Sequence, residues 1–112
     1  MKIAIPTDDG LIVRQHFKGS RGFVVATVKS GMIVHQEMRW NFLSEIMTSE
    51  YGFFYNLVDC DLVMVNEIGN GQRELLKVIK KEIVQTEQTD ITQAFIDYLD
   101  SIPGKIEVRQ TT

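Results

Sequence analysis

A nearly continuous apolar run in the middle of the chain, "CDLVMVNEIG" at residues 60–69, constrains the fold more than any other feature. A strand that is apolar at successive positions is typical of a strand covered on both faces. The segment "NGQRELLKVIKKE" follows at once, and we expect a helix there with Asn70 as its N-cap. Its expected apolar stripe consists of Leu75, Leu76, Ile79 and Ile83. A buried strand that leads directly into a helix indicates a layered α/β domain.

The first 40 residues favour strands joined by turns. We expect strands at residues 2–7, 22–28 and 32–40, with a hairpin turn at Ser30-Gly31 and a very short strand at 11–13. Residues 32–40 alternate in polarity, which predicts a half-exposed strand. The alternation assigns Ile33, His35, Glu37 and Arg39 to one face and Met32, Val34, Gln36, Met38 and Trp40 to the other.

The rest of the chain completes a mixed sheet. We expect a helix over much of 47–58, a short strand at 83–87 and a helix over 90–102 capped by Asp90. Three antiparallel strands followed by two β-α units predict about five strands with helices on both faces of the sheet. With 112 residues we expect a single domain, 1–112, in which 104–112 form a tail or an added edge strand.

Charge and composition narrow the classes of function. The net charge of −3 argues against general binding to nucleic acid or to anionic lipid. No apolar run approaches the roughly 20 residues that span a bilayer, so we expect no membrane segment. The single cysteine, Cys60, cannot form an internal disulfide and suits a cytoplasmic protein. We expect it to be a small buried hydrophobic residue.

Two segments carry chemistry that suits an anionic ligand. The stretch "RQHFKGSRGF", residues 14–23, places one histidine among basic residues and glycines, with Arg14, His16, Lys18 and Arg21 as candidates. The stretch "IGNGQRELL" places Gly69, Asn70 and Gly71 where a strand meets a helix. Free backbone N–H groups at such a helix start can bind anions. In an open sheet with β-α units, ligands gather at these strand ends.

Three motifs in this order resemble a known family. "MKIAIPTDDG", "HF" followed closely by glycine and a basic residue, and "IGNGQRELLK" are similar to the nitrogenase accessory proteins of iron–molybdenum cofactor biosynthesis, of the NifX and NifB C-terminal type. The resemblance covers residues 1 to about 100. It implies a ribonuclease-H-like fold, which agrees with the element order above. It also implies binding, transfer or storage of an iron–sulfur or iron–molybdenum cluster precursor.

The departures from the family pattern affect the expected site. Lys18 separates Phe17 from the glycine that commonly follows "HF", and the chain offers few metal ligands besides His16. Iron–sulfur clusters are held mainly by several cysteine thiolates, which this chain lacks. We therefore expect a small non-enzymatic carrier with degenerate cluster ligation, or with no cluster at all. In the expected site His16 is the one metal ligand, and Arg14, Lys18 and Arg21 face the turn at 69–71.

Two other functions remain open from the residues alone. A protein-interaction domain without a small ligand would use the aromatic residues of the 40–55 region, through a homo-oligomer or a partner protein. A metal-dependent nuclease would use carboxylates from Asp8, Asp9, Glu45 or Glu50, Glu67 and Asp90. The nuclease is disfavoured because the first acids follow Pro6 in a turn. We expect His35 to be a solvated surface residue.

Overall fold

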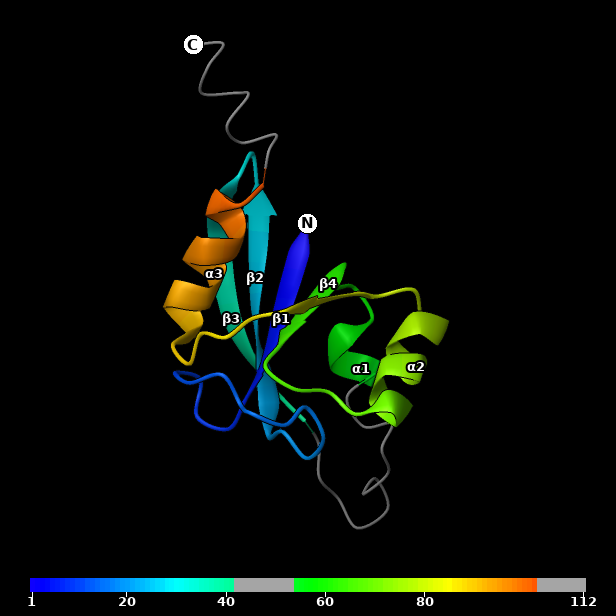
Figure 1. Ribbon diagram of the computed structural model, residues 1–112. Helices are drawn as coiled ribbons and strands as arrows, with labels where there is room; N and C mark the ends of the chain where they lie inside the picture. The colour runs from blue at the N-terminus through cyan, green and yellow to red at the C-terminus, as the bar shows by residue number, and fades with distance from the viewer. Residues whose placement is uncertain (42–53, 103–112) are drawn as a thin grey trace.

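The computed structural model describes residues 1–41 and 54–102, and its centre is a five-stranded mixed sheet (Figure 1). The strands are β1 Lys2–Thr7, β2 Gly22–Lys29, β3 Met32–Trp40, β4 Leu62–Val65 and β5 Glu82–Gln85. They lie in the order β3-β2-β1-β4-β5. The first three strands pair antiparallel, whereas β4 pairs parallel with β1 and with β5. The predicted mixed α/β sheet, three antiparallel strands and two β-α units, is confirmed.

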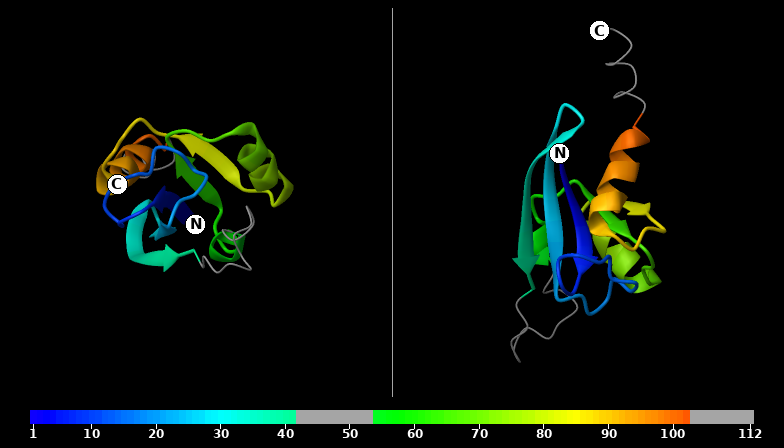
Figure 2. Two further views of the ribbon diagram at one scale, coloured as in Figure 1. Left: turned by 90° about the horizontal axis from the view of Figure 1, so that it is seen from below. Right: turned by 90° about the vertical axis from the view of Figure 1, so that its left-hand side faces the viewer.

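Three described helices cover the sheet, and Figures 1 and 2 show α3 on one face and α1 and α2 on the other. Their bounds are α1 Phe54–Leu57, α2 Asn70–Val78 and α3 Ile91–Asp100. Within the described ranges, no helix is long and apolar enough to cross a membrane.

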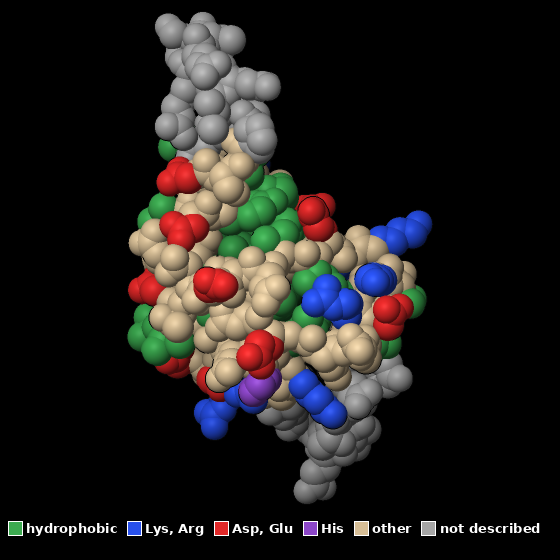
Figure 3. All heavy atoms as spheres, viewed as in Figure 1, with side chains coloured by type: hydrophobic (Ala, Val, Ile, Leu, Met, Phe, Trp, Pro, Cys, Tyr) green, Lys and Arg blue, Asp and Glu red, His purple; other side chains and the backbone are tan. Residues whose placement is uncertain are grey.

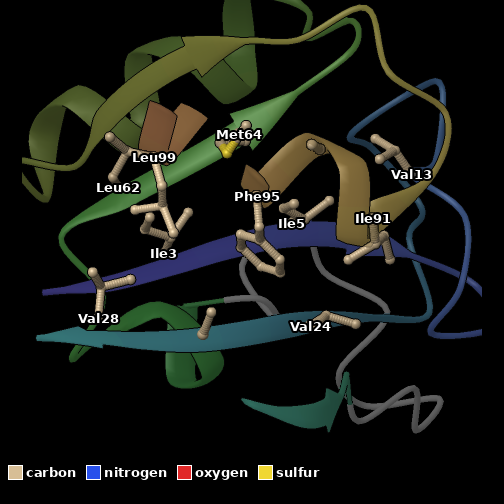
Figure 4. Close-up of a cluster of buried hydrophobic side chains, with 12 residues drawn as sticks. Ile3, Ile5, Val13, Val24, Val28, Leu62, Met64, Ile91, Phe95 and Leu99 are labelled. Carbon is tan, nitrogen blue, oxygen red and sulfur yellow. The ribbon is translucent and has the colours of Figure 1, made fainter. Parts of the chain in front are cut away.

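Alternate side chains of the central strands build a hydrophobic core on each face. Ile3 and Ile5 of β1 point to the α3 face, where they join Phe95 and Leu99 (Figure 4). Ala4, between them, belongs to the opposite cluster with Leu76 of α2. Every one of these residues is at most 6% exposed, so β1 is covered on both sides.

The helix boundaries correct two of the sequence predictions. The N-cap of α2 is Gly69, with extended backbone and no side-chain cap, and Asn70 is the first helical residue. The helix ends at Val78, and Lys80 takes a positive φ of 60° before β5 begins. Ile83 therefore lies in β5 and not on the helix stripe. Asp90 does cap α3, by accepting from the backbone N–H of Gln93.

A β-bulge corrects the predicted faces of β3. The register shifts opposite Thr27 and Val28, so Val34 becomes an extra residue in β3. Ile33 is thereby turned to the same side as Met38, and both pack partly buried against the α3-side core. Strict alternation placed Ile33 on the polar face with His35. This prediction is wrong, because the extra residue Val34 moves Ile33 to the opposite face of the strand.

Two predictions about single residues are confirmed. His35 is exposed on β3, and Cys60 is 2% exposed just before β4. Desolvation raises the pKa of the Cys60 thiol to about 11. A thiol with so high a pKa is a poor metal ligand and a slow nucleophile at neutral pH. The rest of the helix expected over 47–58 and the tail at 104–112 lie outside the described residues.

Candidate binding site

The carboxyl ends of β1 and β4 define the candidate site. The connections that follow these two parallel strands diverge. The loop at 8–21 leads from β1 to β2, whereas β4 leads into α2 (Figure 1). In open sheets with β-α units, a crevice forms where the connections diverge in this way, and ligands commonly bind in it. The topology alone therefore predicts that a ligand binds between the two segments that follow β1 and β4.

Backbone hydrogen bonds hold those two segments together. The N–H of Phe17 donates to the carbonyl oxygen of Glu67 at 3.1 Å, and the N–H of Glu67 donates to the carbonyl oxygen of Gln15 at 2.9 Å. His16 and Glu67 thus form one rung of parallel pairing. The Phe17 side chain is buried and its ring centroid lies 5.7 Å from that of Phe23. The loop is thereby anchored in the core on the α2 side.

A hollow of about 540 Å³ lies between the loop and the start of α2. It is lined by Arg14, His16, Phe17, Lys18, Glu67, Ile68, Gly69 and Gln72. Of the residues proposed from sequence, Arg14, His16, Lys18 and Gly69 line the hollow, whereas Arg21, Asn70 and Gly71 do not. Phe17, Ile68 and Gln72 were not predicted as site residues, and Glu67 was considered only for nuclease chemistry. Only their nearness to His16 and Gly69 in the sequence could have pointed to them.

Asp8 contacts two basic residues of the loop, Arg14 and Arg21. Its carboxylate forms an ion pair with the Arg14 guanidinium and accepts from the backbone N–H of Arg21 at 3.1 Å. Arg14 Nε also donates to the carbonyl oxygen of His16 at 2.9 Å. Asp8 thus compensates the charge of Arg14 and fixes the backbone at Arg21. Arg14 fixes the loop as well as lining the hollow.

His16 stands at the rim beside a carboxylate. Its Nδ1 lies 3.1 Å from Glu67 Oε2, and the two side chains are 66% and 55% exposed. Figure 3 shows a histidine beside an acidic side chain, with basic side chains close by, at the end of the molecule where the loop runs. When one imidazole nitrogen is engaged by a carboxylate, the other nitrogen is available to bind a metal.

The start of α2 borders the hollow through Gly69 and Gln72. The first N–H groups of a helix lack intrahelical partners, and the adjoining Gly69 lines the hollow. A Cβ added to Gly69 would come 2.9 Å from Gln72 Oε1, so a side chain there would displace another lining group. A Cβ added to Gly71 would meet nothing within 4 Å. The described structure thus gives no steric reason for a glycine at position 71.

The acidic residues considered for nuclease chemistry have structural roles where they are described. Asp9 accepts from the backbone N–H groups of Leu11 and Ile12, and these hydrogen bonds lower the pKa of its carboxyl. Asp90 caps α3. Within 1–41 and 54–102, no three His, Cys, Asp or Glu side chains gather in a group that could hold a metal ion. Glu45 and Glu50 lie outside the described residues.

The chain belongs to the dinitrogenase iron-molybdenum cofactor family, whose model matches residues 1–101. No curated protein matches it. Its structure is similar to the crystal structure of PH0822, with a TM-score of 0.76 and 20% identity over 89% of both chains. It is also similar to MJ0327 of Methanocaldococcus jannaschii, provisionally assigned as a dinitrogenase (TM-score 0.70, 17% identity, 89% of this chain and 88% of that one). A third similar structure is TM1290 of Thermotoga, provisionally assigned as a NifB protein (TM-score 0.70, 17% identity, the same coverage). At these identities the three structures establish the fold alone.

Proposed function

We propose that this protein is a non-enzymatic cytoplasmic carrier that binds an anionic metallocluster precursor in the hollow between the 14–18 loop and the start of α2. One observation carries the proposal: His16 and Lys18 share that hollow with Gly69, at the carboxyl ends of β1 and β4, in a chain of the iron-molybdenum cofactor family. The provisional dinitrogenase and NifB assignments of two similar structures support a role in cofactor handling. The strand order supports the ribonuclease-H-like assignment in the same way.

The chemistry of the hollow suits weak binding of a preformed cluster. Lys18 and the start of α2, where Gly69 and Gln72 line the hollow, supply positive potential for an anion. His16 supplies one nitrogen ligand. Cys60 supplies none, because it is buried away from the hollow lining and its pKa is raised. A cluster held by one protein ligand keeps its other positions for a donor or an acceptor, which suits transfer better than storage.

A second function, docking of another protein chain, has one observation in its favour. Trp40 at the end of β3 is 58% exposed, and Tyr55 of α1 is 75% exposed. Exposed aromatic side chains are enriched in protein interfaces. The two functions are compatible, since a carrier must meet the proteins that load and unload it.

The carrier function is tested by anaerobic titration with a synthetic [4Fe–4S] cluster that carries exchangeable thiolate ligands, followed by its absorption spectrum and by equilibrium dialysis. The wild type is expected to bind one cluster per chain. His16→Ala is expected to weaken binding by at least about 10- to 100-fold, because loss of a residue that only supports a metal ligand already costs that much. Lys18→Ala should weaken it less, because Lys18 contributes charge and not a coordinate bond.

Two variants serve as matched controls. His35→Ala removes the other histidine, which is exposed on β3, and Arg21→Ala removes a loop cation that does not line the hollow. Both are expected to bind as the wild type does. A wild type that binds no cluster, or a His16→Ala variant that binds as well as His35→Ala, would rule out the hollow as the cluster site.

A further inference from the structure

Glu67 is unexpected at the rim of a hollow that is proposed to take an anion. A carboxylate at this position repels an anionic ligand unless a neighbouring group compensates its negative charge. Its Oε2 lies 3.1 Å from His16 Nδ1, and its Oε1 accepts from Gln15 Nε2 at 3.4 Å. Both carboxylate oxygens thus face the segment that carries His16. The parallel β-bridge between His16 and Glu67 fixes the distance between the backbones of these two residues.

We propose that Glu67 is a positioning residue that holds the His16 imidazole with Nδ1–H toward the carboxylate and with the lone pair of Nε2 toward the hollow. This inference rests on the proposed function. An ionised carboxylate can only accept hydrogen bonds, so the neutral imidazole must carry its proton on Nδ1. The other nitrogen, Nε2, is then an electron-pair donor and not a hydrogen-bond donor.

This orientation of the His16 imidazole determines which chemical class of ligand the site binds. A lone pair on Nε2 forms a coordinate bond to a metal that has an open or exchangeable position. It cannot donate a hydrogen bond to an oxyanion such as molybdate or phosphate. The site therefore selects an anion that contains a metal with an exchangeable position, such as a cluster, over an oxyanion.

The first test reads the imidazole tautomer in the metal-free protein. Long-range ¹H–¹⁵N correlation spectra of histidine-labelled protein, recorded where both imidazoles are neutral, separate the two nitrogens of each ring. His16 is expected as the Nδ1–H tautomer, while exposed His35 shows the Nε2–H tautomer that free histidine prefers. In Glu67→Ala, His16 should change to the pattern of His35. The matched control is Glu74→Ala, which removes an exposed carboxylate of α2 that pairs with Lys77 at 3.6 Å and should leave the His16 spectrum unchanged.

The second test compares the binding of three ligands: the synthetic cluster, molybdate and inorganic phosphate. The synthetic [4Fe–4S] cluster should bind the wild type about tenfold or more tightly than Glu67→Ala, as expected for loss of a group that orients a metal ligand. Molybdate and inorganic phosphate should leave the His16 resonances unmoved. An Nε2–H tautomer of His16 in the wild type, or oxyanion binding at His16, would overturn the role of Glu67. If the tautomer is as expected but no cluster binds, the carrier function fails while the positioning of His16 stands.

Discussion

At the residue scale, Gly22 is the glycine that the described fold most requires. It begins β2 and pairs with Trp40 of β3. A Cβ at position 22 would lie 2.4 Å from the carbonyl oxygen of Arg39 and 3.0 Å from the Cα of Trp40, both backbone atoms. Because backbone cannot move aside as a flexible side chain can, Gly22→Ala is expected to lower the free energy of unfolding by about 1–3 kcal/mol. Urea denaturation followed by circular dichroism measures this loss.

Gly71→Ala is the control for this prediction. The added Cβ enters open space in the first turn of α2, and alanine is a better helix former than glycine by up to about 1 kcal/mol. The variant should be as stable as the wild type or slightly more stable. Equal stability of Gly22→Ala and Gly71→Ala would show that β2 and β3 can separate at this point without cost.

The sequence predicted part of the site at this scale, for identifiable reasons. His16 and Lys18 stand out because histidine, basic residues and glycines together are typical of an anion-binding loop. Glu67 was considered only for nuclease chemistry, because a carboxylate has no evident use in an anion-binding site until its contact with His16 is seen. Arg21 was included for its charge, but charge in a sequence does not reveal which side of a loop a residue occupies. Arg21 does not line the hollow.

At the element scale, α1 depends on contacts outside itself, since an isolated helix of four residues is not stable. Arg39 of β3 supplies several of these contacts. Its Nη1 donates to the carbonyl oxygen of Asn56 at 2.8 Å, and its Nη2 donates to Asp59 at 3.0 Å and to Glu37 at 2.8 Å. Lys2 Nζ lies 2.9 Å from the same Asp59 carboxylate. The edge strand is thereby tied to the segment between α1 and β4.

This cluster should make stability depend on pH in the acid range. The hydrogen bonds from Arg39 hold the pKa of the Asp59 carboxyl well below its ordinary value of 3.8. A carboxyl whose pKa is lowered by folding stabilises the folded state above its unfolded pKa and loses that contribution as pH falls through the folded value. Asp59→Asn should therefore reduce stability at pH 7 by about 1 kcal/mol, a typical size for a partly exposed pair. It should also flatten the loss of stability below about pH 4.

Asp61→Asn is the matched control for Asp59. Asp61 accepts a hydrogen bond from the backbone N–H of Lys2, a contact that an asparagine side-chain oxygen can keep. Melting temperatures measured from pH 7 to pH 2 should fall along the same curve for the control and the wild type. An Asp59→Asn curve that also follows the wild type would show that the charge of Asp59 contributes nothing to stability.

The elements themselves were largely predictable because burial leaves a pattern in the sequence. The central strands β1, β2 and β4 are apolar at successive positions since both of their faces are covered, and the apolar stripe of α3 recurs at helical spacing. The bulge at Val34 was not predictable, because one inserted residue leaves the alternation of residue types intact while exchanging their faces. The cap of α2 was assigned to Asn70 because asparagine is a common N-cap, yet the backbone of Gly69 takes that place.

At the scale of the whole molecule, β3 is an edge strand of the sheet with one described neighbour, β2, and Figure 2 shows it at the outer side of the sheet. Three large apolar side chains along it are exposed: Met32 at 66%, Val34 at 56% and Trp40 at 58%. An exposed edge with apolar side chains is a common place for another chain to pair or pack. Most of the 40–55 region that the sequence proposed for an interface lies outside the described residues.

We therefore expect the protein to self-associate through β3 and Trp40 as its concentration rises. Sedimentation equilibrium should show an average mass that increases with concentration for the wild type. Trp40→Ser should move that average toward the monomer, because it removes the largest exposed apolar side chain of the edge. Val78→Ser is the matched control, since Val78 is 76% exposed on α2, which packs against β5 at the opposite edge of the sheet, and its loss should leave the association unchanged. A wild type that stays monomeric at every concentration, or equal association of Trp40→Ser and the wild type, would assign the exposed tryptophan no role in contacts between copies.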